Sequence, residues 1–356
     1  MPRLLPLIVI AIAIYFFVKN RRKTRSAAPA SPDVTTDKRA VELGFLPQEA
    51  IDGENAGPRA PELTAALATA RAGGWEAPAA LVASAGKDWE LHNLYVAELA
   101  DIAAEDDAWL LAWEAARPDD ADAAVVRAKS TVYLAGTVRG SAVAKETSQE
   151  QFDGFHRLML RARTEVVRAR ELAPDDDPTP AVCEIWPGVA LRYPHEDMRK
   201  LFAEITDRAP YHYSAHYSAL QYWCQKWRGS VELATEFAAN AAASAPLGSL
   251  LHALPLICWY EHESFGHTSR GYRTPEVSAL VDALAADVAA ADPAHPRLRE
   301  VRLLLTWYLV ELKRYPEALE QFRLVDGYAG AFPWNYSSDP VRAYVAAREL
   351  TVRKAG

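Results

Sequence analysis

Three Ala-Pro pairs recur at a fixed spacing, and this feature constrains the fold more than any other. They stand at Ala173-Pro174, Ala209-Pro210 and Ala245-Pro246, each thirty-six residues from the next. A period of this length is typical of arrays of helical hairpins, because a single hairpin cannot bury its apolar face and needs a neighbour to cover it. The spacing therefore predicts an all-α solenoid of stacked helical hairpins.

The stretch between two successive pairs contains two helical patterns. From Tyr213 to Trp227 the chain is apolar and aromatic with no internal Gly or Pro, which predicts a first helix. The sequence Arg228-Gly229-Ser230 predicts a break, since Gly supplies the left-handed conformation that commonly ends a helix and Ser caps the next one. A second helix is expected from Val231 to Ser244.

Apolar stripes at helical spacing mark the corresponding helices of other units. One stripe consists of Met198, Leu201, Phe202 and Ile205, and another of Val277, Leu280, Val281, Leu284 and Val288. Thr274 followed by Pro275 predicts the capped start of the second of these helices. Helices with a weaker period are expected from Pro61 onward.

One segment resembles a known repeat. The residues Tyr315-Pro316-Glu317-Ala318-Leu319-Glu320-Gln321-Phe322 are similar to the Y-x2-A-x3-F core of tetratricopeptide repeats. The chain departs from that pattern at Thr306, where the family has a small residue, and at Pro187, which is expected to interrupt a first helix. The repeats therefore resemble degenerate tetratricopeptide repeats, whose first helices line a concave surface.

A longer pattern is similar to an uncharacterised family of actinobacterial helical proteins over roughly residues 60 to 345. That resemblance implies a helical fold and no particular activity. The pattern consists of Arg139-Gly140-Ser141, Ala173-Pro174-Asp175-Asp176 and Lys226-Trp227-Arg228-Gly229-Ser230.

The N-terminal segment predicts a membrane helix. Leu4–Val18 is an uncharged run of fifteen residues, which as a helix spans roughly 22 Å of a hydrocarbon layer roughly 30 Å thick. Arg3 and Lys19 can extend the span, because their stems reach toward the headgroups. The cations that follow the run are expected to hold that side in the cytoplasm. Ala28-Pro29-Ala30 would suit signal-peptide cleavage, so a secreted protein stays open as an alternative, as does a peripheral anchor.

Composition divides the chain into three expected parts. Residues 1–25 form a transmembrane anchor with a basic flank, 26–60 a flexible linker rich in Pro, Gly and polar residues, and 61–356 the α-helical repeat domain. Residues 1–25 contain six of the 39 Lys and Arg and none of the 47 Asp and Glu. The remainder therefore has 33 basic against 47 acidic residues, a formal charge of −14, which argues against a nucleic-acid partner.

Few side chains suggest chemistry. His212 and His216 are four residues apart, a spacing that can place two imidazoles on one metal, but Tyr213 stands where metalloproteases have Glu. Glu261-His262-Glu263 with His267 is a richer group, although histidines five apart do not align on a helix. Neither group predicts a metal, a cofactor or a catalytic residue. The three cysteines, Cys183, Cys224 and Cys258, lie in apolar helices and are expected to be buried thiols.

An insertion marks a candidate binding loop. The interval from Pro246 to Pro293 is 47 residues, eleven longer than the period, and the excess falls within residues 264–274. Insertions in repeat arrays emerge as loops on one face, often the binding face, and a solvated loop without a binding role is the alternative. The aromatic first helices are expected to supply a groove for a peptide, with core packing as the alternative. The candidate binding residues are His216, Trp223, Trp227, Trp259, Glu261, His262, Phe265, Arg270, Tyr272 and Arg273.

The sequence thus predicts a membrane-tethered helical-repeat scaffold that binds a protein or peptide partner on the cytoplasmic face, without chemistry of its own. Two alternatives stay open. One is a metal-dependent or hydrolytic enzyme on a helical toroid, with the cluster around His262 as its site. The other is a secreted binding module released by signal cleavage.

Overall fold

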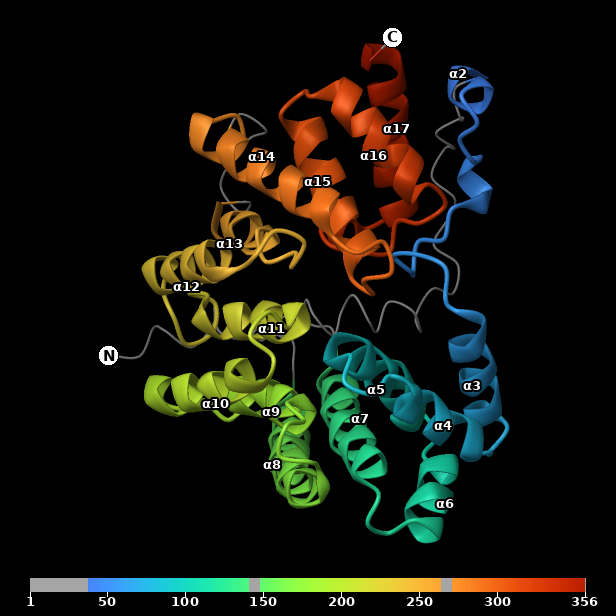
Figure 1. Ribbon diagram of the computed structural model, residues 1–356, viewed down its shortest axis with the longest axis vertical. Helices are drawn as coiled ribbons and strands as arrows, with labels where there is room; N and C mark the ends of the chain where they lie inside the picture. Colours follow the sequence, from blue (N-terminus) through green and yellow to red (C-terminus); the bar gives the residue numbers. More distant parts are fainter. Residues whose placement is uncertain (1–37, 141–147, 264–270, 356) are drawn as a thin grey trace. The chain divides into compact units, whose positions relative to one another are not determined.

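The computed structural model describes residues 38–140, 148–263 and 271–355, and within these ranges the protein is all-α and helical-repeat-like. Among the described residues, β-type backbone pairing is limited to one isolated bridge, between Asp52 and Tyr328. The described residues fall into two units (Figure 1). Arg59–Ala234 form the first, and the residues up to Pro58 join those from Thr235 onward in the second.

The helices alternate along the chain as successive pairs. Those of the first unit are α3 (Pro61–Arg71), α4 (Glu76–Ser84), α5 (Trp89–Ala103), α6 (Ala108–Ala116), α7 (Ala121–Arg139), α8 (Gln149–Leu172), α9 (Thr179–Ala190), α10 (His195–Arg208) and α11 (Tyr213–Trp223). The unit boundary falls within α12 (Val231–Ser244). The second unit contains α2 (Lys38–Glu42), η1 (Gln48–Ala50), α13 (Ala253–Glu263), α14 (Pro275–Ala290), α15 (Leu298–Glu311), α16 (Tyr315–Val325), η3 (Trp334–Tyr336) and α17 (Pro340–Ala355).

The Ala-Pro pairs end helices, as the repeat predicts. Ala173 is the C-cap of α8, Ala209 is the C-cap of α10, and Ala245 directly follows the last residue of α12. The proline that comes next cannot continue a helix, because it lacks the backbone N–H. This confirms that thirty-six residues, the spacing of the pairs, span one helix pair.

The apolar stripes face the core. On α8 the buried residues Met159, Ala162, Val166 and Ala169 recur at three or four positions, and Met198, Leu201 and Ile205 do the same on α10. The expected cap of α14 also forms, since the Thr274 hydroxyl accepts a hydrogen bond of 3.2 Å from the Val277 N–H. The local sequence alone therefore predicts that these helices form and which face of each is buried.

Two local expectations need correction. The helix expected from Tyr213 to Trp227 ends at Trp223, because Cys224 adopts an extended backbone and begins a turn. Gly229 is not in the left-handed region; instead its backbone passes so close to Trp223 that a Cβ would lie 1.7 Å from that residue's carbonyl oxygen. Pro187 does not interrupt α9, which continues to Ala190, since the hydrogen bond that proline forgoes lies only one turn from the helix end.

In the first unit, the first helices of successive pairs are arranged along a tight curve. Helix α5 contacts α7, α7 contacts α9, and α9 contacts α11, while α5 also contacts both α9 and α11. The contact between α5 and α11 rests on Glu90 of α5, a residue that is 8 % exposed. Its carboxylate accepts the Ser214 N–H at 3.1 Å and the Ser214 hydroxyl, and lies 2.8 Å from Nδ1 of His212. The curve therefore closes on itself, around a buried polar contact.

Residues 39–58, part of the range expected to be a flexible linker, pack against the C-terminal helices of the second unit. Phe45 and Ile51 are buried, and Asp52 exchanges backbone hydrogen bonds of 2.8 Å with Gly327 and Ala329. Apolar residues within a polar segment thus find a surface that sequence alone does not reveal.

Arg348 of α17 holds this segment in place. Its fully buried guanidinium donates to the Leu46 carbonyl at 2.8 Å, to Asp326 at 3.1 Å and to Glu349 at 3.0 Å. Three acceptors compensate the cost of removing the cation from water.

The expected membrane helix, Leu4–Val18, lies outside the described residues, as do all of residues 1–25 and residues 26–37 of the expected linker. Within the described ranges no helix is both long enough and apolar enough to cross a bilayer.

Replacing Arg348 by alanine is expected to lower the free energy of unfolding by about 3–5 kcal/mol, because Asp326 and Glu349 would keep their charges without the cation. Urea denaturation followed by circular dichroism measures the change. Arg342→Ala, at an exposed position of the same helix, is the control and should stay within about 0.5 kcal/mol of the wild type. A midpoint for Arg348→Ala that matches this control would contradict the assigned role.

Candidate functional site

The aromatic residues expected to line a groove in the first unit are buried. His216, Trp223 and Trp227 are 4–5 % exposed. Trp227 packs edge-on against Trp186 at 6.2 Å, and Trp223 packs against His195 at 5.1 Å. These rings pack against α9 and α10, the two helices of the preceding pair, since His216 also contacts Phe202 of α10 with ring centroids 4.9 Å apart. In the structure these side chains are part of the core, which is the alternative that the sequence left open.

His212, the N-cap of α11, and His216, within that helix, belong to the same buried polar contact. Nδ1 of His212 faces Glu90, and Nδ1 of His216 lies 2.9 Å from the His212 carbonyl oxygen. Burial lowers the pKa of His216 to about 4, because the interior disfavours the charged imidazole. In residues 38–140, 148–263 and 271–355 no three His, Cys, Asp or Glu side chains gather as metal ligands would.

The candidate binding residues of the second unit differ in their environments. Phe265, Arg270 and His267 are outside the described residues, and so is the side chain of Glu263. Tyr272 is buried against Trp307 and Tyr308, with ring centroids 5.1 and 6.0 Å away. The remaining candidates are the half-buried Trp259 and His262, the buried Glu261, which accepts from the Tyr336 hydroxyl at 3.3 Å, and the exposed Arg273, which donates to the Glu311 carbonyl at 2.8 Å.

Cysteine chemistry finds little support. The three cysteines are buried and no disulfide joins them, as the sequence predicts. Cys258 lies 3.5 Å from Nδ1 of His262, an arrangement seen with nucleophilic thiols. Burial nevertheless raises the pKa of Cys258 to about 11 and that of Cys183 to about 11, so both stay protonated near neutral pH.

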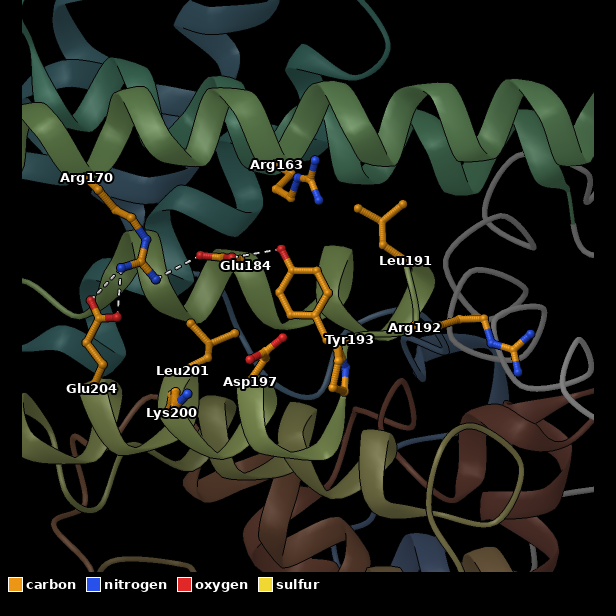
Figure 2. A pocket seen from close by; sticks show the side chains of 11 residues that line it. Arg163, Arg170, Glu184, Leu191, Arg192, Tyr193, Asp197, Lys200, Leu201 and Glu204 are labelled. Atoms are coloured by element: carbon orange, nitrogen blue, oxygen red, sulfur yellow. Dashed lines mark hydrogen bonds and ion pairs between the residues drawn. The ribbon is translucent and has the colours of Figure 1, made fainter.

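A polar cleft of about 600 Å³ opens between α8, α9 and α10 (Figure 2). This volume lies within the usual range of ligand pockets, roughly 300–1,000 Å³. Helices α8 and α10 form its two sides, α9 its floor, and the turn that joins α9 to α10 its end. The lining residues are Arg163, Arg170, Glu184, Leu191, Arg192, Tyr193, Pro194, Asp197, Lys200, Leu201 and Glu204.

Helical spacing explains why these side chains share one space. Arg163 and Arg170 are seven residues apart on α8, so both project from the same flank two turns apart. On α10, Asp197, Lys200, Leu201 and Glu204 fall at i, i+3, i+4 and i+7. Leu201 belongs to the buried stripe, and its polar neighbours extend from the edge of that stripe to the cleft.

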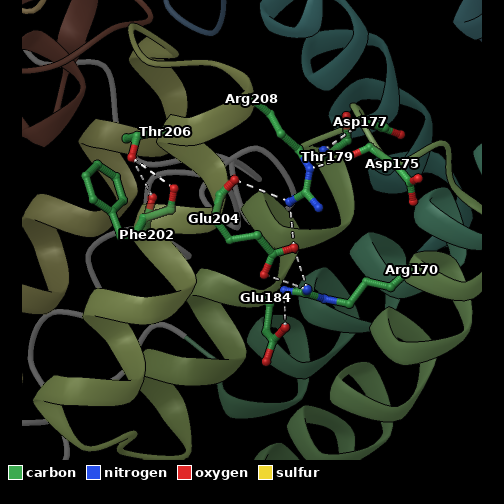
Figure 3. Close-up of polar contacts among 10 residues, drawn as sticks. Arg170, Asp175, Asp177, Thr179, Glu184, Phe202, Glu204, Thr206 and Arg208 are labelled. Carbon is green, nitrogen blue, oxygen red and sulfur yellow. Dashed lines mark hydrogen bonds and ion pairs between the residues drawn. The ribbon is translucent and has the colours of Figure 1, made fainter.

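One end of the cleft is closed by ion pairs (Figure 3). Arg170 donates to both carboxylate oxygens of Glu204, at 2.6 and 2.7 Å, and to Glu184 at 2.8 Å. Arg208 adds a 2.7 Å hydrogen bond to Glu204. Burial opposes ionisation of Glu204, but the hydrogen bonds from the two arginines outweigh it and lower its pKa. This network links three consecutive helices.

Tyr193 stands at the centre of the cleft, with its hydroxyl directed to Glu184 (Figure 2). The hydroxyl donates to that carboxylate at 2.9 Å. Burial, followed by the charge of Glu184, raises the pKa of Tyr193, so the phenol remains neutral. Glu184 is thus occupied by two donors, Arg170 and Tyr193.

The open end of the cleft carries Arg163 and Arg192, both exposed. Arg192 has a left-handed backbone (φ 62°) in the turn after α9. Neither guanidinium has a carboxylate partner among the described residues. Sequence reasoning missed this site, although the polar residues at i and i+7 along the edges of α8 and α10 are a signal that could have indicated it.

Comparison with known proteins gives no family: no protein-family model, curated protein or solved structure matches this chain. The site must therefore be interpreted from its own geometry.

The buried His216 predicts a loss of stability in acid. Its pKa is about 4 in the folded protein against an ordinary value of 6.5, so the unfolded chain binds the proton first. As pH falls from 6.5 to 4, this group should reduce the free energy of unfolding by on the order of 1 kcal/mol per pH unit. Denaturation of wild type and His216→Leu across this range measures it. The variant should show the shallower dependence, although its stability at pH 7 will differ; equal slopes would contradict the prediction.

Proposed function

We propose that this protein is a helical-repeat scaffold that binds a segment of a partner protein, and that the cleft between α8, α9 and α10 is the binding site. The single observation that carries the proposal is the cleft itself, an open space of about 600 Å³ with polar side chains on three helices and a turn. Rigid helices hold these side chains. This favours recognition, because the cleft loses little conformational entropy when a partner binds.

The contacts along the chain support a finer architectural proposal. From α3 to α10, and again from α13 to α17, each helix lies against the next one in the sequence, and α5, α7, α9 and α11 contact one another in succession. We propose that the pairs form a degenerate tetratricopeptide-like solenoid, related to the actinobacterial helical family that the sequence resembles. In such a stack α8 and α10 are second helices of successive pairs, so the cleft lies on the side of the stack opposite the inner helices.

The polar groups of the cleft favour binding over chemistry. Glu184 and Glu204 are held by hydrogen bonds from Arg170, and the Tyr193 hydroxyl is directed to Glu184. Groups engaged in this way fix a shape and a charge pattern, whereas a general base needs a free lone pair within reach of a substrate.

Binding is tested by photo-crosslinking in cells. A photo-reactive amino acid placed at Leu191 or Lys200, both in the cleft, is expected to capture a partner protein. The same amino acid at Arg323, an exposed position of α16, serves as the control. The proposal fails if neither cleft position yields a crosslinked species beyond those obtained from position 323.

We further propose that the scaffold is tethered to a membrane, with its helical part on the cytoplasmic side. The support is the sequence pattern of Leu4–Val18 followed directly by five cations, Lys19, Arg21, Arg22, Lys23 and Arg25.

Fractionation tests the tether. The protein is expected to sediment with membranes, to resist extraction by high salt, and to be protected from protease added to intact cells. A mature chain that begins near Ser31, found by N-terminal sequencing, would instead support the secreted alternative.

A further inference from the structure

We infer that the segment bound in the cleft is acidic, and that its carboxylates pair with Arg163 and Arg192. This inference rests on the proposed function, because it names the chemistry of the partner at the same site.

Only some of the cations that line the cleft are paired with a carboxylate. Of the four cations that line it, Arg170 is bonded to Glu184 and Glu204, and Lys200 pairs with Glu196 at 2.7 Å. Arg163 and Arg192 have no carboxylate partner in the part of the chain that the structure describes. Two arginines are therefore available for an incoming anion.

Arg163 is already positioned by its surroundings. It extends from α8 toward Tyr193 (Figure 2), and its positive charge acts on the pKa of that phenol in the direction opposite to burial and to Glu184. Tyr193 is in turn fixed by its hydrogen bond to Glu184. An arginine held against a neutral phenol keeps its full charge and most of its five N–H donors for a ligand.

The location makes these two charges effective. Residues 26–356 carry a formal charge of −14, so a site with unpaired cations stands out against the rest of the chain. A partly enclosed cleft has a lower effective dielectric than the open surface, which strengthens a salt bridge formed within it. The same overall acidity disfavours a nucleic acid, whose phosphates would meet repulsion over the adjoining surface.

Apolar contacts beside the cleft fit a peptide better than a small anion. Leu160 and Val167 are 38 % and 53 % exposed, and their spacing from Arg163 on α8 places all three on one side of the helix. A peptide that places acidic side chains at Arg163 and Arg192 can lay apolar side chains along Leu160 and Val167. A free carboxylate or phosphate would leave the Leu160 and Val167 side chains exposed to solvent.

Asp197 sets a limit on the charge of the segment. It lines the cleft from the first turn of α10, and no cation of the described chain pairs with it. A carboxylate placed opposite Asp197 would be repelled, whereas an amide or hydroxyl donor would be accepted. The cleft therefore favours acidic residues interspersed with neutral ones over an unbroken acidic run.

The test uses the full chain and two synthetic peptides. One alternates glutamate with small apolar and amide residues, and the other has glutamine in place of every glutamate. Fluorescence anisotropy at low salt is expected to show at least about tenfold tighter binding of the glutamate peptide, and this preference should weaken as salt is added.

Substitutions assign the effect to the two arginines. Arg163→Gln and Arg192→Gln are each expected to weaken binding of the glutamate peptide about three- to tenfold, and together to remove its advantage over the glutamine peptide. Arg157→Gln is the matched control, because Arg157 is an exposed arginine of the same helix that does not line the cleft. Since all three side chains are exposed, the variants should melt like the wild type.

Two results would overturn the inference: equal binding of the two peptides, or wild-type affinity in the double variant Arg163→Gln/Arg192→Gln. Its failure can be told from failure of the proposed function. If positions 191 and 200 capture a partner whose crosslinked segment is neutral or basic, the scaffold stands and the charge assignment falls. If neither position captures a partner, both fall.

Discussion

A carboxylate buried between α5 and α11 is the contact on which the arrangement of the first unit depends. Glu90 receives hydrogen bonds from Ser214 and faces His212, so residues 124 positions apart in the chain share one polar core. The charge is tolerated because Ser214 donates to it and His212 lies beside it, both at the start of α11. Closing this contact brings α5 and α11, the start and the end of a helical curve, together.

The rings of α11 and of the turn after it pack on the preceding helix pair. Trp223 and His216 contact His195 and Phe202 of α10, and Trp227 contacts Trp186 of α9, whereas the cleft stays open between α8 and α10. Its walls are rigid, since Arg170 ties Glu184 of α9 to Glu204 of α10. Ion pairs in a half-buried setting contribute modestly to stability. Their clearer role here is to fix which cations are consumed and which, Arg163 and Arg192, stay available.

The second unit is held by a comparable device. Arg348 ties the backbone at Leu46 to Asp326 and Glu349, and the neighbouring segment extends this contact with main-chain hydrogen bonds to Gly327 and Ala329. In both units a buried charge joins segments that are distant in sequence. Apolar stripes can slide against one another with little loss, whereas a buried ion must find its own partners, so such contacts specify one packing.

Local sequence determined the helices of this protein, their caps and their buried faces. Ala173 and Ala209 end helices, Thr274 caps one, and Met198 and Ile205 point inward because these features need only the residues within a turn or two. Tertiary structure alone decided the rest. Whether an aromatic residue such as Trp223 is core or surface depends on which helix packs against it, and here His195 and Arg199 of α10 cover its ring. The cleft likewise needs residues from α8, α9 and α10 together, and a local pattern cannot show which flanks of different helices will face each other.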